Sequence, residues 1–92
     1  MKQIRASHIL VNNEEHAKQL IEELKKGVKF EDLAKKFSKC PSGDKGGDLG
    51  YFGKGMMVPQ FENAAFKLKV GEISQPIKTQ FGYHLIKKTD EK

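Results

Sequence analysis

The sequence predicts a small α+β domain built on a mostly antiparallel sheet. Three observations support this. Residues 3–11 alternate as a strand does, residues 17–24 and 30–37 carry apolar side chains at helical spacing, and residues 81–88 are apolar on both faces as far as Ile86. A strand that is apolar on both faces is typical of the centre of a sheet. The expected order is therefore strand, helices, short strand, helix and two strands.

In the first strand, alternate residues share a face. The residues on the face of interest are Ile4, Ala6, His8 and Leu10. Asn12-Asn13 then offers N-caps for a helix, and Asn12 with Glu15 has the spacing of a capping box. We expect that helix to stop at Gly27.

The middle of the chain is rich in glycine. Residues 40–50 contain four glycines and Pro41, which favour tight turns and leave room for at most a single helical turn. Pro59 suits the first turn of a helix. The remaining elements are expected in this order: a helix over 30–37, a short strand over 49–52, a helix from Pro59, a brief strand near 73–75 and a final strand over 81–88.

Length and composition limit the possible classes of protein. A chain of 92 residues suffices for one domain and is too short for two, so we expect a single domain over 1–92. Hydrophobic residues form 37% of the chain and charged residues 32%, which indicates a globular domain and not a disordered tail. No apolar run approaches the ~20 residues of a membrane span.

The net charge is +5, and Arg5 is the only arginine. Lysines attract acidic partners loosely, whereas phosphate recognition favours the guanidinium fork of arginine. The basic balance is therefore interpreted first as a solvated surface. The alternative is weak docking on an anionic membrane, a nucleic acid or an acidic protein face.

Cys40 is the only cysteine, which rules out an intrachain disulfide and suits a reducing compartment. The first residues are not followed by the apolar segment and cleavage site of a secretory signal. We therefore expect a cytoplasmic protein.

Two histidines fall on strand positions that favour burial. His8 shares its face with apolar residues, and His84 lies on the strand expected at the centre of the sheet. A single inward histidine is most often a hydrogen-bonded core residue, but two on adjacent strands would bring their rings together. Thr79 could supply a hydroxyl group to this pair.

Cys40 is open to three interpretations. A free cysteine is often a small buried hydrophobe. Together with a histidine it suggests a thiolate nucleophile, although no residue that would orient the histidine can be identified from spacing. A zinc site made of Cys40, His8 and His84 is the third, and it lacks the close paired spacing of structural zinc sites.

Four motifs follow one another along the chain, from about Gln3 to Lys88. They are Ala6-Ser7-His8-Ile9-Leu10-Val11, then Phe37-Ser38-Lys39-Cys40-Pro41-Ser42 with Gly46-Gly47-Asp48-Leu49-Gly50, then Gly55-Met56-Met57-Val58-Pro59-Gln60-Phe61, and finally Thr79-Gln80-Phe81-Gly82-Tyr83-His84. Each motif alone is weak, but together they are specific, and they resemble the parvulin family of peptidyl-prolyl cis/trans isomerases.

The resemblance implies a parvulin-like (FKBP-like) fold, in which about three to four helices surround a four-stranded, mostly antiparallel sheet. It also implies catalysed rotation about Xaa-Pro peptide bonds in proline-containing peptides and unfolded or flexible segments. No bond is broken, so no cofactor and no metal are expected. The site residues that it implies are a proline pocket of Leu49, Met57 and Phe61, a hydrogen-bonded network of His8, His84 and Thr79, and Cys40 near the rotating carbonyl as a polar group.

Two departures indicate the phosphate-independent branch of the family. The chain passes straight from the first strand into an acidic helix start, where the phosphorylation-dependent branch has a long basic loop. Phe81 replaces a small polar residue and makes the substrate site more apolar. A non-catalytic domain that holds unfolded chains in the same groove is the main alternative, and a monomer is the default expectation.

Overall fold

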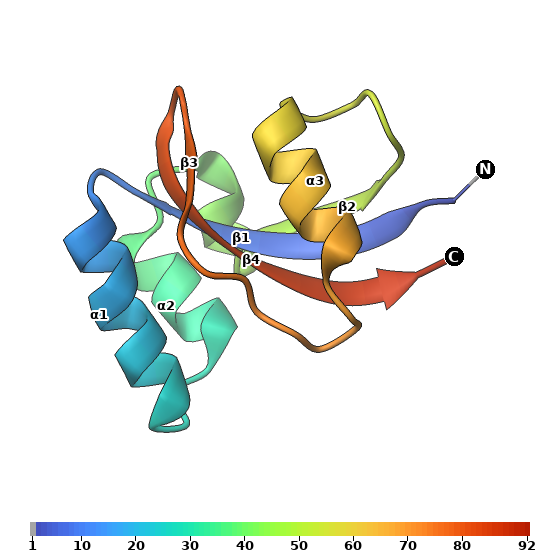
Figure 1. Ribbon diagram of the computed structural model, residues 1–92. Coiled ribbons are helices and arrows are strands. Elements are labelled where there is room, and N and C mark those ends of the chain that lie inside the picture. The colour runs from blue at the N-terminus through green and yellow to red at the C-terminus, as the bar shows by residue number, and fades with distance from the viewer. Residues whose placement is uncertain (1) are drawn as a thin grey trace.

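The computed structural model describes residues 2–92. One antiparallel sheet with the strand order β2-β1-β4-β3 separates three α-helices into two groups (Figure 1). The prediction of a four-stranded sheet with three to four helices is confirmed. The elements are β1 (Ile4–Val11), α1 (Glu14–Lys25), α2 (Phe30–Phe37), the 3-10 helix η1 (Pro41–Lys45), β2 (Asp48–Phe52), α3 (Pro59–Lys67), β3 (Ile77–Thr79) and β4 (Gly82–Glu91).

The two long strands, β1 and β4, lie side by side at the centre of the sheet. Their antiparallel register pairs His8 with Ile86 and Leu10 with His84. The two histidines therefore lie on adjacent strands and on the same face, as their places in the sequence predict.

Each face of the sheet has its own apolar core. Ile9 and Val11 of β1 pack beneath α1 and α2, whereas Ile4 and Ala6 pack beneath α3. This alternation follows from the two-residue period of a strand. In Figure 1 the blue and green helices α1 and α2 lie apart from the orange helix α3, with the central strands between them.

The first helix begins one residue later than a capping box at Asn12 requires. Asn13 is the N-cap, and its side-chain oxygen accepts a hydrogen bond from the His16 N–H at 2.8 Å. Asn13 has the extended backbone that an N-cap needs. The predicted pairing of Asn12 with Glu15 is therefore wrong, and the stop near Gly27 is confirmed by its left-handed φ of 99°.

The brief strand predicted near 73–75 is also misplaced. Residue 73 forms one isolated bridge to Lys87, and the strand β3 comes later, at Ile77–Thr79. Pro76 has no N–H to donate, so regular pairing starts beyond it. A two-residue turn at Gln80 and Phe81 then joins β3 to β4, which is why β4 begins at Gly82 and not at Phe81.

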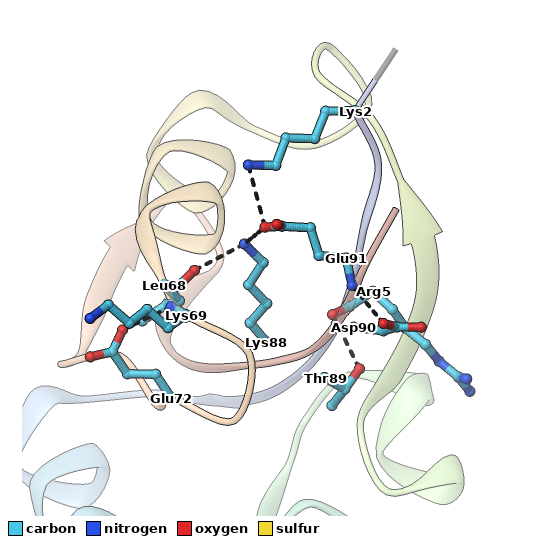
Figure 2. Close-up of polar contacts among 9 residues, drawn as sticks. All are labelled: Lys2, Arg5, Leu68, Lys69, Glu72, Lys88, Thr89, Asp90 and Glu91. Atoms are coloured by element: carbon cyan, nitrogen blue, oxygen red, sulfur yellow. Dashed lines mark hydrogen bonds and ion pairs between the residues drawn. The ribbon is translucent and has the colours of Figure 1, made fainter.

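The far end of β4 holds a buried lysine that the sequence does not single out. Lys88 is 2% exposed, and its ammonium group donates to the Leu68 carbonyl at 2.9 Å and to the Glu91 carboxylate. Lys2 reaches the same carboxylate at 3.3 Å (Figure 2). We call Lys88, Glu91, Lys2 and the Leu68 carbonyl the lysine clamp, because they tie both ends of the chain to the end of α3.

Within residues 2–92 no helix has both the length and the apolar character that a membrane crossing would require.

Candidate active site

The predicted site residues surround one cavity of about 380 Å³. Its walls come from β1, the segment before η1, β2, the start of α3 and the β3–β4 turn. The residues that line it are His8, Leu10, Lys39, Cys40, Pro41, Leu49, Met57, Val58, Phe61, Phe81 and His84. Seven of the eight predicted residues are among them, and the eighth, Thr79, lies behind His84. Their placement in one cavity agrees with the predicted site, and their roles stay predictions.

The two imidazole rings meet beneath the cavity. His8 Nδ1 and His84 Nδ1 are 3.0 Å apart, and the rings are nearly parallel, with an angle of 16° between their planes. His84 Nε2 lies 2.7 Å from the Thr79 hydroxyl, and His8 Nε2 lies 3.2 Å from the Ser42 hydroxyl. The four side chains thus form a single hydrogen-bonded row, which we call the imidazole row.

Two proton arrangements satisfy the imidazole row, and each involves all four members. When His8 Nδ1 donates to His84 Nδ1, the Ser42 hydroxyl donates to His8 and His84 Nε2 donates to Thr79. When the direction is reversed, every donor and acceptor changes places, because a neutral imidazole has one donor and one acceptor. In both arrangements each ring carries one proton. A second proton on the ring that accepts at Nδ1 would place two N–H groups against each other.

Burial favours the neutral form of both rings. Desolvation, and secondarily the neighbouring His84, lowers the pKa of His8 to about 4, and desolvation also lowers the pKa of His84. At neutral pH the row beneath the cavity therefore carries no charge. Such a floor keeps the site apolar while it retains directional hydrogen bonds.

Phe61 connects the imidazole row to the proposed proline pocket. Its ring contacts both imidazoles edge to face, with centroid distances of 5.5 Å to His8 and 5.4 Å to His84. Phe61 is 3% exposed and belongs to the core beneath α3. The row therefore positions the aromatic floor on which a proline ring could rest.

A family model described as the PPIC-type PPIase domain, a peptidyl-prolyl isomerase domain, matches residues 1–92. The chain belongs to this family. The prediction of a parvulin-type isomerase domain is confirmed.

Relatives of this PPIase domain include both longer and equally short proteins. Foldase protein PrsA of Bacillus subtilis (strain 168) is 60% identical over 90 residues, which cover 97% of this chain and 31% of that protein. The crystal structure of the peptidylprolyl isomerase PrsA from Bacillus anthracis has a TM-score of 0.97 and 52% identity over 99% of this chain and 42% of its own. NmPin, the parvulin of Nitrosopumilus maritimus, has a TM-score of 0.88 and 54% identity, over 97% of both chains. The chain spans about a third of the length of the curated relatives it matches.

Cys40 of the PPIase domain lies on the cavity wall, just before η1. It is half-buried, and its N–H lies 3.4 Å from the Ser38 hydroxyl. No group of three or more His, Cys, Asp and Glu side chains within residues 2–92 has the arrangement of a metal site. The pairing of the two imidazoles with each other engages the Nδ1 atoms that a zinc site could use, so the geometry does not favour the zinc interpretation.

A glycine makes the imidazole row possible. Gly47 has a φ of 87°, and its carbonyl accepts a hydrogen bond from the His8 N–H at 2.9 Å. A Cβ atom at this position would lie 2.3 Å from the His8 carbonyl oxygen. The Gly46-Gly47 pair of the PPIase motif therefore allows the loop to approach β1 at the point where His8 points into the site.

Sequence reasoning missed Ser42. Its hydroxyl completes the row at the His8 end, opposite Thr79. The available signal was Pro41, which starts a helical turn after Cys40 and so turns Ser42 back towards β1. Spacing alone could not show which of the polar residues between 38 and 48 would reach the histidine.

Proposed function

We propose that this PPIase domain acts on Xaa-Pro bonds preceded by an apolar or uncharged residue, and that it does not require phosphorylated substrates. The observation that carries this proposal is the apolar cavity wall, which Leu49, Met57 and Phe61 form together with Phe81. Phe81 is 60% exposed at the tip of the β3–β4 turn, where it can cover the residue before proline. Arg5 is on another part of the surface, where it forms a two-pronged pair with Asp48 at 3.1 and 2.6 Å.

The chemistry requires no covalent step. Rotation about an Xaa-Pro bond passes a barrier of ~18–20 kcal/mol, in which amide resonance is lost. A pocket that holds the proline ring while the preceding carbonyl turns, in surroundings with little water, favours the twisted form over the planar one. In this proposal Leu49, Met57 and Phe61 hold the ring, and Cys40 faces the turning carbonyl.

The imidazole row has a positioning role in this proposal. His8 and His84 support the pocket through Phe61, and Thr79 and Ser42 hold the ends of the row. Thr79 also accepts the Phe81 N–H at 3.2 Å, so the same hydroxyl orients the turn that carries Phe81. The row thus connects the pocket floor with the residue proposed to set specificity.

The test is an NMR-exchange measurement of isomerisation across peptides that differ in the residue before proline. We expect Leu-Pro and Ala-Pro peptides to be accelerated more than Glu-Pro and phosphoserine-Pro peptides. Preference for an acidic or phosphorylated peptide would contradict the phosphate-independent assignment. Background rates for every peptide would instead support the alternative of a domain that only holds unfolded chains.

Partners and location are part of the proposal. The substrates are proline-containing peptides and unfolded or flexible segments, and the domain acts as a monomer. The cytoplasmic location is proposed from the single cysteine alone. Weak association of the lysine-rich surface with anionic surfaces would show as binding to anionic vesicles that is lost at high salt.

A further inference from the structure

One charged side chain stands among the residues that line the active-site cavity. Lys39 contributes to the wall beside Leu10 and Cys40, and the other lining residues are apolar side chains, the half-buried thiol and the two histidines of the neutral row. The cavity within the described chain therefore has a single permanent charge, and that charge is positive.

The backbone of Lys39 is held in place by β1. The Lys39 N–H donates to the Leu10 carbonyl at 2.8 Å, and the Leu10 N–H donates to the Ser38 hydroxyl at 3.1 Å. The same hydroxyl lies near the Cys40 N–H. These hydrogen bonds fix the backbone position from which the Lys39 side chain extends over the cavity. The ammonium end of the side chain is free to move in solvent.

The charge of Lys39 has no ion-pair partner among residues 2–92. Lys39 takes part in none of the ion pairs formed by residues 2–92, whereas Lys25 and Lys26 of α1 pair with Glu22 and Glu23. Among the residues that the structure describes, no carboxylate lines the cavity. An apolar wall beside an unpaired charge strengthens its attraction for an oppositely charged group on a bound peptide.

We propose that Lys39 makes this isomerase favour substrates with a carboxylate next to the Xaa-Pro pair, on either the residue that precedes Xaa or the residue that follows proline. The inference rests on the proposed function, since it assumes that proline occupies the Leu49, Met57 and Phe61 pocket. The residue directly before proline meets Phe81 and stays apolar. A single ammonium group matches one carboxylate, whereas a phosphate dianion is best held by guanidinium forks or several cations.

The experiment uses peptides with the core Zaa-Leu-Pro-Yaa, in which leucine is the residue directly before proline. Either Zaa or Yaa is Glu, Gln or Lys. NMR exchange gives kcat/KM, and titration in the same spectra gives Kd. At low ionic strength we expect Glu to exceed Lys by about two- to fivefold at one of the two positions, the range of an exposed ion pair. In about 1 M NaCl, where the Debye length is about 3 Å, the preference should disappear.

The decisive variant is Lys39→Glu, which should invert the Glu-to-Lys ranking at that position. Lys35→Glu is the matched control, because Lys35 is exposed on α2, lies outside the cavity wall and changes the net charge equally. A variant that lost its fold or its catalytic activity would show a lower kcat/KM for every peptide, and the ratio of kcat/KM between Glu and Lys peptides would stay unchanged.

The outcomes separate the two proposals. If the Gln peptides are not accelerated, the proposed function fails, and the Kd ranking still decides the role of Lys39. If Glu and Lys peptides rank equally in the native protein, or if Lys39→Glu leaves their ranking as it was, the inference about Lys39 is overturned. Inversion in Lys39→Glu but not in Lys35→Glu supports it.

Discussion

Two buried polar groups lie on the same face of β4, with Ile86 between them, and they differ in charge. His84 is 4% exposed and belongs to the neutral imidazole row, whereas Lys88 is 2% exposed and forms an ion pair with Glu91. The partners explain the difference. His84 meets another imidazole and a hydroxyl, which are satisfied by neutral rings, while Lys88 meets a carboxylate and the carbonyl at the end of α3.

The comparison shows how one strand serves two purposes. The neutral row supports an apolar cavity, where a buried charge would attract water. The lysine clamp joins the end of α3 to both ends of the chain, at a distance from the cavity (Figure 2), and its Glu91 partner remains partly open to solvent. Changes to the clamp should therefore alter stability, and changes to the row should alter both stability and catalysis.

The largest effect is expected from Lys88→Ala. It removes a buried aliphatic stem, worth about 0.8 kcal/mol per methylene, and leaves the Leu68 carbonyl without its donor, so we expect a loss of about 4 kcal/mol in the free energy of unfolding. Lys88→Met keeps the stem and should lose about 2 kcal/mol. Urea unfolding measures both. The control is Lys87→Ala on the opposite face, which should stay within about 0.5 kcal/mol, and an equal loss in all three variants would contradict the clamp.

The second-largest effect is expected from acid, which should lower the free energy of unfolding through the neutral row. The pKa of His8 is about 4 in the folded protein, below the ordinary 6.5, so the unfolded chain binds more protons between these values. Stability therefore falls as the pH falls from about 6.5 to about 4, by about 3 kcal/mol from His8 alone. Unfolding measured against pH checks this.

The variant His8→Asn provides the control for the pH effect. It should reduce the pH dependence of stability between pH 4 and 6.5, and His84, whose pKa is also lowered, accounts for part of what remains. Three carboxyl groups also have lowered pKa values: Asp48, Asp90 and Glu91. The stability that they contribute is lost only as the pH falls below their ordinary pKa values. An unchanged slope in His8→Asn would show that the row is not its source.

A charge placed beside the neutral row tests how the site uses Cys40. Cys40→Ala should lower kcat/KM by about tenfold, the equivalent of one hydrogen bond of ~1.4 kcal/mol, while the fold survives. Cys40→Asp should retain more activity than Cys40→Ala, if the role is electrostatic or hydrogen-bonding. Equal inactivity of the two variants, measured by NMR exchange with a Leu-Pro peptide, would reject that role.

The smallest effect is expected at the end of the row. Ser42→Ala removes the hydroxyl that meets His8 Nε2, and one hydrogen bond contributes about 1 kcal/mol to stability. We expect a loss of that size in urea unfolding, with a small decrease in kcat/KM. Ser42→Thr should restore both, because it retains the hydroxyl. If Ser42→Thr behaves like Ser42→Ala, the contact does not contribute.

Much of the domain could be predicted because its signals are local. The 3.6-residue period of 30–37 and the glycine at 27 specify helices and their ends within a few residues. The errors are also local: Asn13 and not Asn12 caps α1, and β3 begins after Pro76. In both cases the pattern allowed two neighbouring solutions, and hydrogen bonding chose between them.

By itself, the sequence determined the order of the elements and the central place of β4, since periodicity carries that information, and the resemblance carried by its ordered motifs predicted the residues of the apolar pocket. Only the tertiary structure decided that Ser42 would complete the imidazole row and that Lys88 would be buried against Leu68 and Glu91. It also decided that Lys39 would be the one charged residue among the described residues that line the cavity. His8 and His84 are 76 positions apart, and their contact depends on strand register and on the close approach of Gly47. Such contacts depend on how distant segments pack, and no local pattern in the chain encodes their geometry.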